Sequence, residues 1–215
     1  MPALEAFGPS IAIGLILFVM LWFALGTQRN IRKGNAVLRW LQGGLPILGH
    51  RTTMRWLGSS AVELGIVEPQ TPFREATVVV VLEPRDVPLL WAFARSRGRR
   101  DFVIIRANLE RAPGFSMDIR DPRGWTGRPD EADGEWRDSG GGTVTLEGPG
   151  ADDALIRGAW DRLSGLTAGV GRMTVQQVVP HVEVHFRPPV GAGPGARAEH
   201  VVGPIRDLAR KLSGS

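Results

Sequence analysis

The longest apolar stretch of the chain lies near its N-terminus, where Ile11 to Leu25 contains no charged residue. With the five residues before it, this run is about 20 residues long, which is roughly what a helix needs to cross the hydrocarbon core of a bilayer. Pro9 stands near the start, where a helix tolerates proline. The pattern predicts a membrane-spanning helix within residues 1–28. Its anchoring side chains are Ile11, Leu15, Phe18 and Trp22.

Two other interpretations of this apolar run remain open. Ala24-Leu25-Gly26 resembles the small-residue site at which a signal peptide is cleaved, and the run could also be a buried core helix. A signal peptide, however, carries positive charge before its apolar region, whereas the only charge there is Glu5. The basic residues follow the apolar run instead. This asymmetry favours an anchor in the cell membrane, with the N-terminus outside and the bulk of the chain in the cytoplasm.

Residues 29–68 alternate basic and apolar positions, which is typical of amphipathic helices lying in the lipid headgroup layer. Helices are predicted over Asn35 to Gln42 and over Thr52 to Leu64, separated by Gly43-Gly44 and Pro46. Alternatively, their apolar faces pack on the soluble domain or on a partner's membrane helix. The residues predicted to contact lipid headgroups are Arg29, Arg32, Lys33, Arg39 and Trp40.

Residues 69–187 alternate short β-branched runs with helical periodicity, which predicts one α/β soluble domain. Strands are expected at 76–82, 102–105, 115–120 and 143–147, helices at 87–97 and 152–166, and extended chain at 173–186. This order favours an α+β fold of the ferredoxin-like type, a split βαβ sandwich with both helices on one face of the sheet. An open α/β sheet with another strand order is the alternative.

The remaining segments are less regular. Residues 121–142 are polar and glycine-rich, with an acidic middle between Asp130 and Glu135, and they predict a loop. Residues 188–215 begin with a Gly/Pro-rich linker. A C-terminal amphipathic helix is expected from about Pro204, with Ile205, Leu208 and Leu212 on one side.

Charge and composition narrow the functional classes. The net charge is +4, but six basic residues and no acidic residue lie between Arg29 and Trp56, so the rest of the chain is close to neutral. A nucleic-acid-binding protein needs its basic stripe on the folded domain, and nucleic acid is therefore not an expected partner. The chain has no cysteine, which excludes disulfides and thiolate catalysis.

One short group of residues has side chains that could bind a metal ion. In His181-Val-Glu-Val-His185, alternate side chains of a strand would place His181, Glu183 and His185 on one face. Two imidazoles and a carboxylate are suitable ligands for zinc or a similar ion. An ordinary solvated strand face, with Val182, Val184 and Phe186 on the core side, explains the same pattern.

No catalytic set or cofactor motif accompanies these features. The turn after the first domain strand, Leu82 to Asp86, has no glycine and carries carboxylates, which argues against a phosphate-binding loop. No nucleophile elbow is present, so neither a catalytic residue nor a cofactor is predicted. The sequence favours a membrane-anchored interaction, assembly or regulatory protein with a protein partner of unknown identity. A membrane-tethered enzyme, or a metal- or ligand-binding domain that uses the His181 face, is the alternative.

Overall fold

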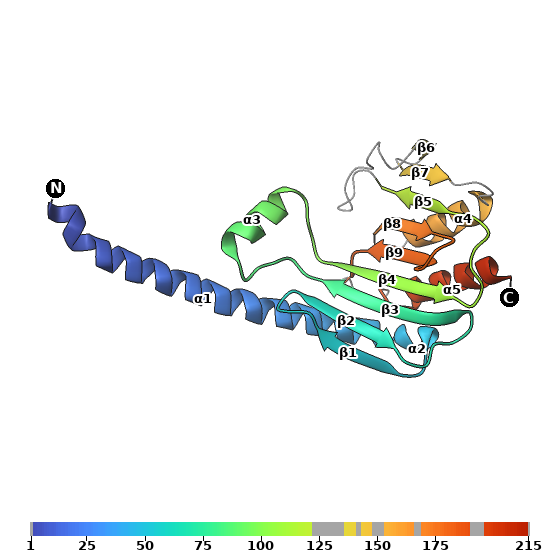
Figure 1. The fold of residues 1–215 in the computed structure, drawn as a ribbon, viewed down its shortest axis with the longest axis horizontal. Coiled ribbons are helices and arrows are strands. Elements are labelled where there is room, and N and C mark those ends of the chain that lie inside the picture. The colour runs from blue at the N-terminus through green and yellow to red at the C-terminus, as the bar shows by residue number, and fades with distance from the viewer. Residues whose placement is uncertain are drawn as a thin grey trace.

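The computed structural model describes residues 2–121, 136–140, 143–147, 153–165, 169–189 and 196–214. Over these ranges the protein is a mixture of helices and strands, with one long apolar helix at the N-terminus and one antiparallel sheet (Figure 1). The helices are α1 (Pro2–Leu41), α2 (Leu45–Leu48), α3 (Pro88–Ser96), α4 (Asp153–Ser164) and α5 (Glu199–Ser213).

The described strands form one sheet in the order β1-β2-β3-β4-β9-β8-β5-β7-β6, and every neighbouring pair is antiparallel. Their bounds are β1 (Thr52–Trp56), β2 (Ala61–Ile66), β3 (Phe73–Val81), β4 (Phe102–Leu109), β5 (Met117–Arg120), β6 (Arg137–Gly140), β7 (Thr143–Glu147), β8 (Val170–Val175) and β9 (Val182–Phe186).

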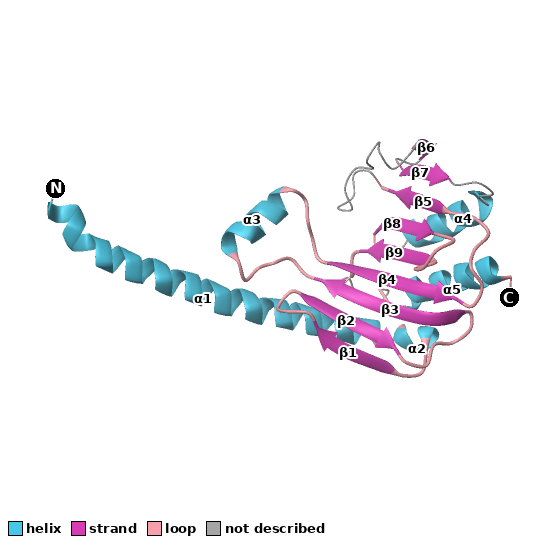
Figure 2. Ribbon diagram, in the orientation of Figure 1, coloured by secondary structure: helices cyan, strands magenta, loops and turns pink. Residues whose placement is uncertain are grey.

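The hydrophobic core lies between the sheet and the helices on one of its faces. Figure 2 shows α2, α4, α5 and the C-terminal end of α1 along this face. Alternate residues of the central strands, such as Val78, Ile105 and Val184, are fully buried and form one cluster with Leu41 of α1 and Ile205 of α5. The described helices leave the other face of the sheet uncovered.

Helix α1 is long and apolar enough to cross a membrane, as the sequence predicts. Only 6% of its most apolar window is buried in the structure, so this half is not a core helix of the domain. The same helix then continues without a break to Leu41, whose side chain is fully buried in the domain core. The helix predicted over Asn35 to Gln42 is the last part of α1 and not a separate element.

The amphipathic helix predicted over Thr52 to Leu64 is wrong, because this segment forms β1 and β2. Its apolar residues fit a strand period as well as a helical one. In β2, Val62, Leu64 and Ile66 alternate with half-buried neighbours and pair with β3, so burial in the sheet decided the conformation. Residues 52–66 therefore belong to the same sheet as residues 73–186, although the sequence placed a domain boundary at residue 69.

The structure does not confirm the ferredoxin-like topology. In a split βαβ unit the helix joins strands that run parallel, but β3 and β4, on either side of α3, are adjacent and antiparallel. Helix α3 is thus an insertion at the end of a hairpin, and Figure 1 shows it beyond the sheet, beside the middle of α1. The other helices and strands predicted for residues 69–215 are present, and α5 begins at Glu199. Within the loop predicted over 121–142, residues 137–140 form β6, because they pair with β7, and the acidic middle from 130 to 135 lies outside the described residues.

Candidate functional site

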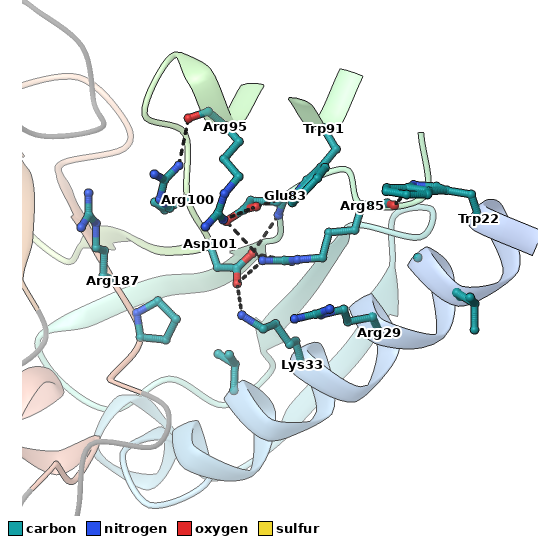
Figure 3. A pocket seen from close by; sticks show the side chains of 14 residues that line it. Trp22, Arg29, Lys33, Glu83, Arg85, Trp91, Arg95, Arg100, Asp101 and Arg187 are labelled. Carbon is teal, nitrogen blue, oxygen red and sulfur yellow. Dashed lines mark hydrogen bonds and ion pairs between the residues drawn. The ribbon is translucent and has the colours of Figure 1, made fainter. Parts of the chain in front are cut away.

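A cavity of about 860 Å³ lies where α1 meets the sheet domain. Its walls come from α1, from the turn between β3 and α3, from α3 itself, and from the residues just before β4 and just after β9. Figure 3 shows Arg29 and Lys33 entering from α1, with Arg100 and Arg187 on the opposite side. The lining residues are Trp22, Leu25, Gly26, Arg29, Lys33, Val37, Glu83, Arg85, Trp91, Arg95, Arg100, Asp101, Arg187 and Pro188.

The wall made by α1 depends on a close approach of two backbones. A Cβ atom on Gly26 would lie 2.2 Å from the carbonyl oxygen of Arg85, so only glycine fits at this position. One turn earlier, the indole nitrogen of Trp22 donates a hydrogen bond of 3.0 Å to that same carbonyl oxygen. One turn later, Asn30 is fully buried and its amide nitrogen donates to the carbonyl oxygen of Glu83. Helix α1 is therefore fixed to the turn at three successive levels.

At the centre of the cavity wall, Arg85 is held by carboxylates. Its guanidinium makes two hydrogen bonds of 2.9 Å to Asp101, a third to the side-chain oxygen of Asn30, and an ion pair of 3.2 Å with Glu83. Arg85 and Glu83 are both buried. Asp101 also accepts hydrogen bonds from Lys33 of α1 and from the backbone N–H of Glu83. This network links α1, the turn and the start of β4.

The same network controls the protonation of Asp101. Burial acts to raise the pKa of this carboxyl, but the hydrogen bonds from Arg85 and from the Glu83 backbone, with the positive charges of Arg85 and Lys33, outweigh it. The pKa of Asp101 is therefore lowered from 3.8. Asp101 remains an anion at neutral pH and neutralises one of the surrounding cations.

Two tryptophans form the wall of the cavity nearest to the apolar half of α1. The rings of Trp22 and Trp91 lie 6.1 Å apart between their centroids. The indole nitrogen of Trp91 donates a hydrogen bond of 2.8 Å to Glu83, and the guanidinium of Arg95 stands 5.6 Å from the Trp91 ring centre. Both polar edges are thus satisfied, while the aromatic faces continue the apolar surface of α1.

The cavity keeps an excess of positive charge after these pairings. Six basic side chains line it, against the two carboxylates of Glu83 and Asp101. In the described part of the chain, neither Arg29 nor Arg187 makes an ion pair, and Arg100 donates only to the backbone carbonyls of Arg95 and Arg99. Arginine guanidinium groups prefer carboxylate and phosphate oxygens as partners. The arrangement is suited to binding an anion.

The predicted metal residues lie elsewhere, on or near the uncovered face of the sheet. His181 precedes β9, is buried, and accepts a hydrogen bond at Nδ1 from the backbone N–H of Leu109. Glu183 contacts His185 and accepts a hydrogen bond of 2.6 Å from Arg106 on β4. No group of three or more histidine, aspartate or glutamate side chains is placed to hold a metal ion within the ranges that the structure describes.

Glu183 pairs with Arg106 across two strands and with His185 within β9. Burial acts to raise the pKa of Glu183, but the hydrogen bond and charge of His185, and those of Arg106, lower it to about 2. Farther along the same face, Asp118 accepts hydrogen bonds from both Arg120 and Arg172. On this face the carboxylates are thus neutralised by basic side chains of the same strand and of neighbouring strands.

The residues predicted to contact lipid lie in four different places. Trp22, Arg29 and Lys33 line the cavity, and Ile11, Leu15 and Phe18 are exposed on the apolar half of α1. Arg32 and Arg39 are exposed on α1 outside the cavity lining. Trp40 lies inside the domain: its ring is 6.1 Å from that of Phe186, and its indole donates to the carbonyl oxygen of Ala196.

The sequence did not reveal Arg85, Arg100, Asp101 and Arg187 as neighbours, because they come from three separate segments. In the sequence, the carboxylates of the turn Leu82 to Asp86 argue against an anion site. In the structure its carboxylate Glu83 is already paired with Arg85 and Arg95. One signal was available: Gly26, Asn30 and Gly34 recur at helical spacing on one side of α1, which marks a face that packs closely on protein.

Comparison with known proteins assigns no function. No protein-family model matches the chain, and no curated protein matches its sequence. The functional argument therefore depends on the geometry of the chain itself.

Proposed function

We propose that this protein is a single-pass, membrane-anchored assembly or regulatory protein that works by binding and not by catalysis. The observation that supports this most directly is the continuity of α1, which runs unbroken from an exposed apolar half into the core of the sheet domain. A flexible linker would let the domain tumble, whereas an unbroken helix fixes its orientation at the membrane. Such a fixed orientation is useful when one surface must meet a partner in the same membrane.

In this proposal the sheet domain lies on the cytoplasmic side of the cell membrane and the N-terminus lies outside. The first basic residues, Arg29, Arg32 and Lys33, come directly after the apolar run, and only Glu5 is charged before it. Basic residues are retained on the cytoplasmic side during insertion.

Helix α3 supplies a second attachment to the lipid. Its Leu89 is 84% exposed, and Leu90 and Phe93 are also exposed. The helix packs beside Trp22, near the end of the apolar run, so these side chains lie at the level where the membrane surface would be. Arg95 at the end of the helix and Arg97 just after it follow these side chains, as expected for a helix that lies in the interface.

The surface best placed to bind a protein partner is the uncovered face of the sheet. It carries charged side chains in cross-strand pairs, including Arg55 with Glu63 and Arg106 with Glu183. Side chains such as Arg55 and Arg106 are 70% and 47% exposed. Because α1 fixes the domain, this face keeps one angle to the membrane. The alternative use of the sheet, a metal site at His181, Glu183 and His185, draws no support from the described contacts.

Anchoring is tested by extracting membranes with alkaline carbonate. The full chain is expected to stay in the membrane pellet, because an inserted helix of this apolarity resists extraction. Release into the supernatant would contradict the proposal. A protease-accessibility assay on sealed vesicles checks the orientation, and digestion of the sheet domain from the outer side of intact cells would reverse it.

Partner binding is tested by photo-crosslinking in native membranes. A photoreactive amino acid replaces Arg106 on the uncovered face, and the matched control replaces Asp207, which is exposed on α5 behind the sheet. We expect one discrete crosslinked protein band from position 106 and none from position 207. Equal crosslinking at both positions, or none at position 106, would count against this face as the binding surface.

A further inference from the structure

The cavity between α1 and the sheet domain carries more positive charge than its own carboxylates neutralise. Arg85 and Lys33 are held by Asp101, and Arg95 contacts Glu83, so these cations have structural partners. Arg29 and Arg187 make no ion pair with any described residue, although both line the cavity. Arg100, which also lines the cavity, donates only to backbone carbonyls within the described ranges. Three like charges without a counterion repel one another, and such an arrangement is stabilised when an anion binds among them.

The position of the cavity along α1 indicates where this anion comes from. Trp22 and Leu25 belong to the apolar run, and both line the cavity. Arg29 lies four residues beyond Leu25, or about 6 Å farther along the helix. The headgroup layer of a bilayer is only about 5–7 Å thick on each side. The guanidinium of Arg29 therefore lies at the level of the lipid phosphates when the apolar run spans the membrane.

The wall that faces the lipid has the chemistry of an interface. The paired rings of Trp22 and Trp91 present aromatic surface next to the basic groups, and tryptophan is enriched at this depth. Leu89 and Phe93 are exposed on α3, the helix that also carries Trp91. A lipid with its phosphate in the cavity would have its acyl chains beside Trp22 and Leu25, in the same direction as the apolar half of α1.

We propose that this cavity binds the phosphate group of an anionic phospholipid taken from the membrane that α1 spans. Arg29, Arg100 and Arg187 bind the phosphate oxygens, while Arg85, held by Asp101 and Asn30, maintains the wall behind them. Zwitterionic phosphatidylcholine carries the same phosphate with a cationic group attached, and the excess positive charge of the cavity repels that group. Selectivity for net anionic headgroups follows. The bound lipid fixes α1 against the start of β4 and the segment after β9.

This inference rests on the proposed insertion of α1, and the experiment separates the two. The full chain is reconstituted into lipid nanodiscs that contain phosphatidylcholine with or without phosphatidylglycerol, and retained lipid is counted by native mass spectrometry after transfer to detergent. Failure to enter the nanodiscs would contradict membrane anchoring. Entry without selective retention of phosphatidylglycerol would overturn the lipid site alone.

Matched variants locate the site. The pair Arg29→Ala with Arg187→Ala removes two cavity cations, while Arg32→Ala with Arg74→Ala removes the same charge from exposed positions outside the cavity. We expect phosphatidylglycerol retention to fall about tenfold or more in the first pair, because each alanine removes charge-assisted hydrogen bonds to the phosphate. The control pair should bind as the unaltered chain does. An equal loss of phosphatidylglycerol binding in both pairs would indicate general electrostatic attraction and would overturn the proposed lipid site.

Two further arms complete the test. Replacement of Arg29 and Arg187 by lysine keeps the charge and should retain much of the binding that alanine removes, which separates recognition from a folding defect. Inorganic phosphate is titrated into the detergent-solubilised chain as the soluble probe. If inorganic phosphate bound to the cavity and phosphatidylglycerol did not, the lipid source would be wrong. Weak phosphate binding beside strong phosphatidylglycerol retention is the expected result.

Discussion

The two halves of α1 form one continuous helix but lie in different environments. From Gly8 to Leu25 nearly every side chain is exposed, including large apolar ones such as Leu17 at 61%. From Gly26 to Leu41 a stripe of residues is buried against the domain, and it includes two glycines and the amide side chain of Asn30. Most of the more hydrophobic half thus lies away from the domain, which it meets at Trp22 and Leu25, and the more polar half enters the core. Small size and hydrogen-bonding capacity, more than hydrophobicity, mark the face that packs on protein.

The largest effect is expected from Arg85, which links the polar half of α1 to the turn. Arg85→Met removes the guanidinium that pairs with the buried Glu83 and the half-buried Asp101, and we expect a loss of about 3–5 kcal/mol in the free energy of unfolding. Chemical denaturation of the purified chain in detergent measures it. Arg32→Met, on an exposed part of α1, is the control and should change little. A value for Arg85→Met close to that of the control would show that the two regions are not joined in this way.

The apolar half is tested by adding a charge at its centre. Phe18→Arg should cost about 3 kcal/mol in membrane insertion, since an arginine at mid-helix opposes partition into lipid. The domain should unfold as before, because Phe18 is exposed and touches no core residue. The fraction that resists carbonate extraction measures insertion. Ile31→Arg makes the same change on an exposed apolar residue beyond the run, and an equal loss there would remove the distinction between the two halves.

Adding a single methyl group should also change the unfolding free energy by different amounts in the two halves. Gly26→Ala forces a Cβ against the backbone of Arg85, and we expect a loss of about 1–3 kcal/mol in unfolding free energy. Gly14→Ala meets nothing within 4 Å and should have almost no effect on the domain. Thermal unfolding of both variants in the same detergent provides the comparison. Similar melting temperatures for the two variants would contradict close packing at Gly26.

The smallest effect concerns the uncovered face of the sheet, where a change of pH should alter the free energy of unfolding without involving α1. The folded pKa of Glu183 is about 2, below its ordinary 4.5, so its stabilising contribution is present above pH 4.5 and disappears as the pH falls toward 2. Because water partly screens the pair, we expect about 1–2 kcal/mol. Unfolding free energies measured between pH 6 and about pH 2 should fall less steeply for Glu183→Gln. An unchanged slope would mean that this carboxyl does not carry the dependence.

Much of the local structure could be predicted from periodicity alone. The apolar run, the strands around Val78 and Ile105, the helix at 88–96 and the C-terminal helix all follow the patterns that were used to predict them. The error at 52–64 arose because a short amphipathic segment fits a period of 3.6 or 2, and only pairing with β3 selects the strand. The sheet order was also beyond reach, since α3 appears in sequence as a crossover helix.

The candidate site shows the same division. Trp22, Arg29 and Lys33 are predicted to contact lipid because their position relative to an apolar run is a property of the sequence, and the structure shows that they line the cavity. Their neighbours Arg85, Arg100 and Arg187 lie 56 to 158 positions farther on when counted from Arg29. No spacing rule connects residues that far apart.

The sequence by itself determined that an apolar helix precedes a basic segment and a mixed α/β domain, because hydrophobic periodicity and charge order are local properties. Only the tertiary structure decided that this helix continues into the core, that its glycines allow a turn to approach, and that basic groups from separate segments surround one cavity. The physical reason is that close packing and electrostatic pairing act between atoms that are near in space. These interactions do not depend on how far apart the residues are along the chain.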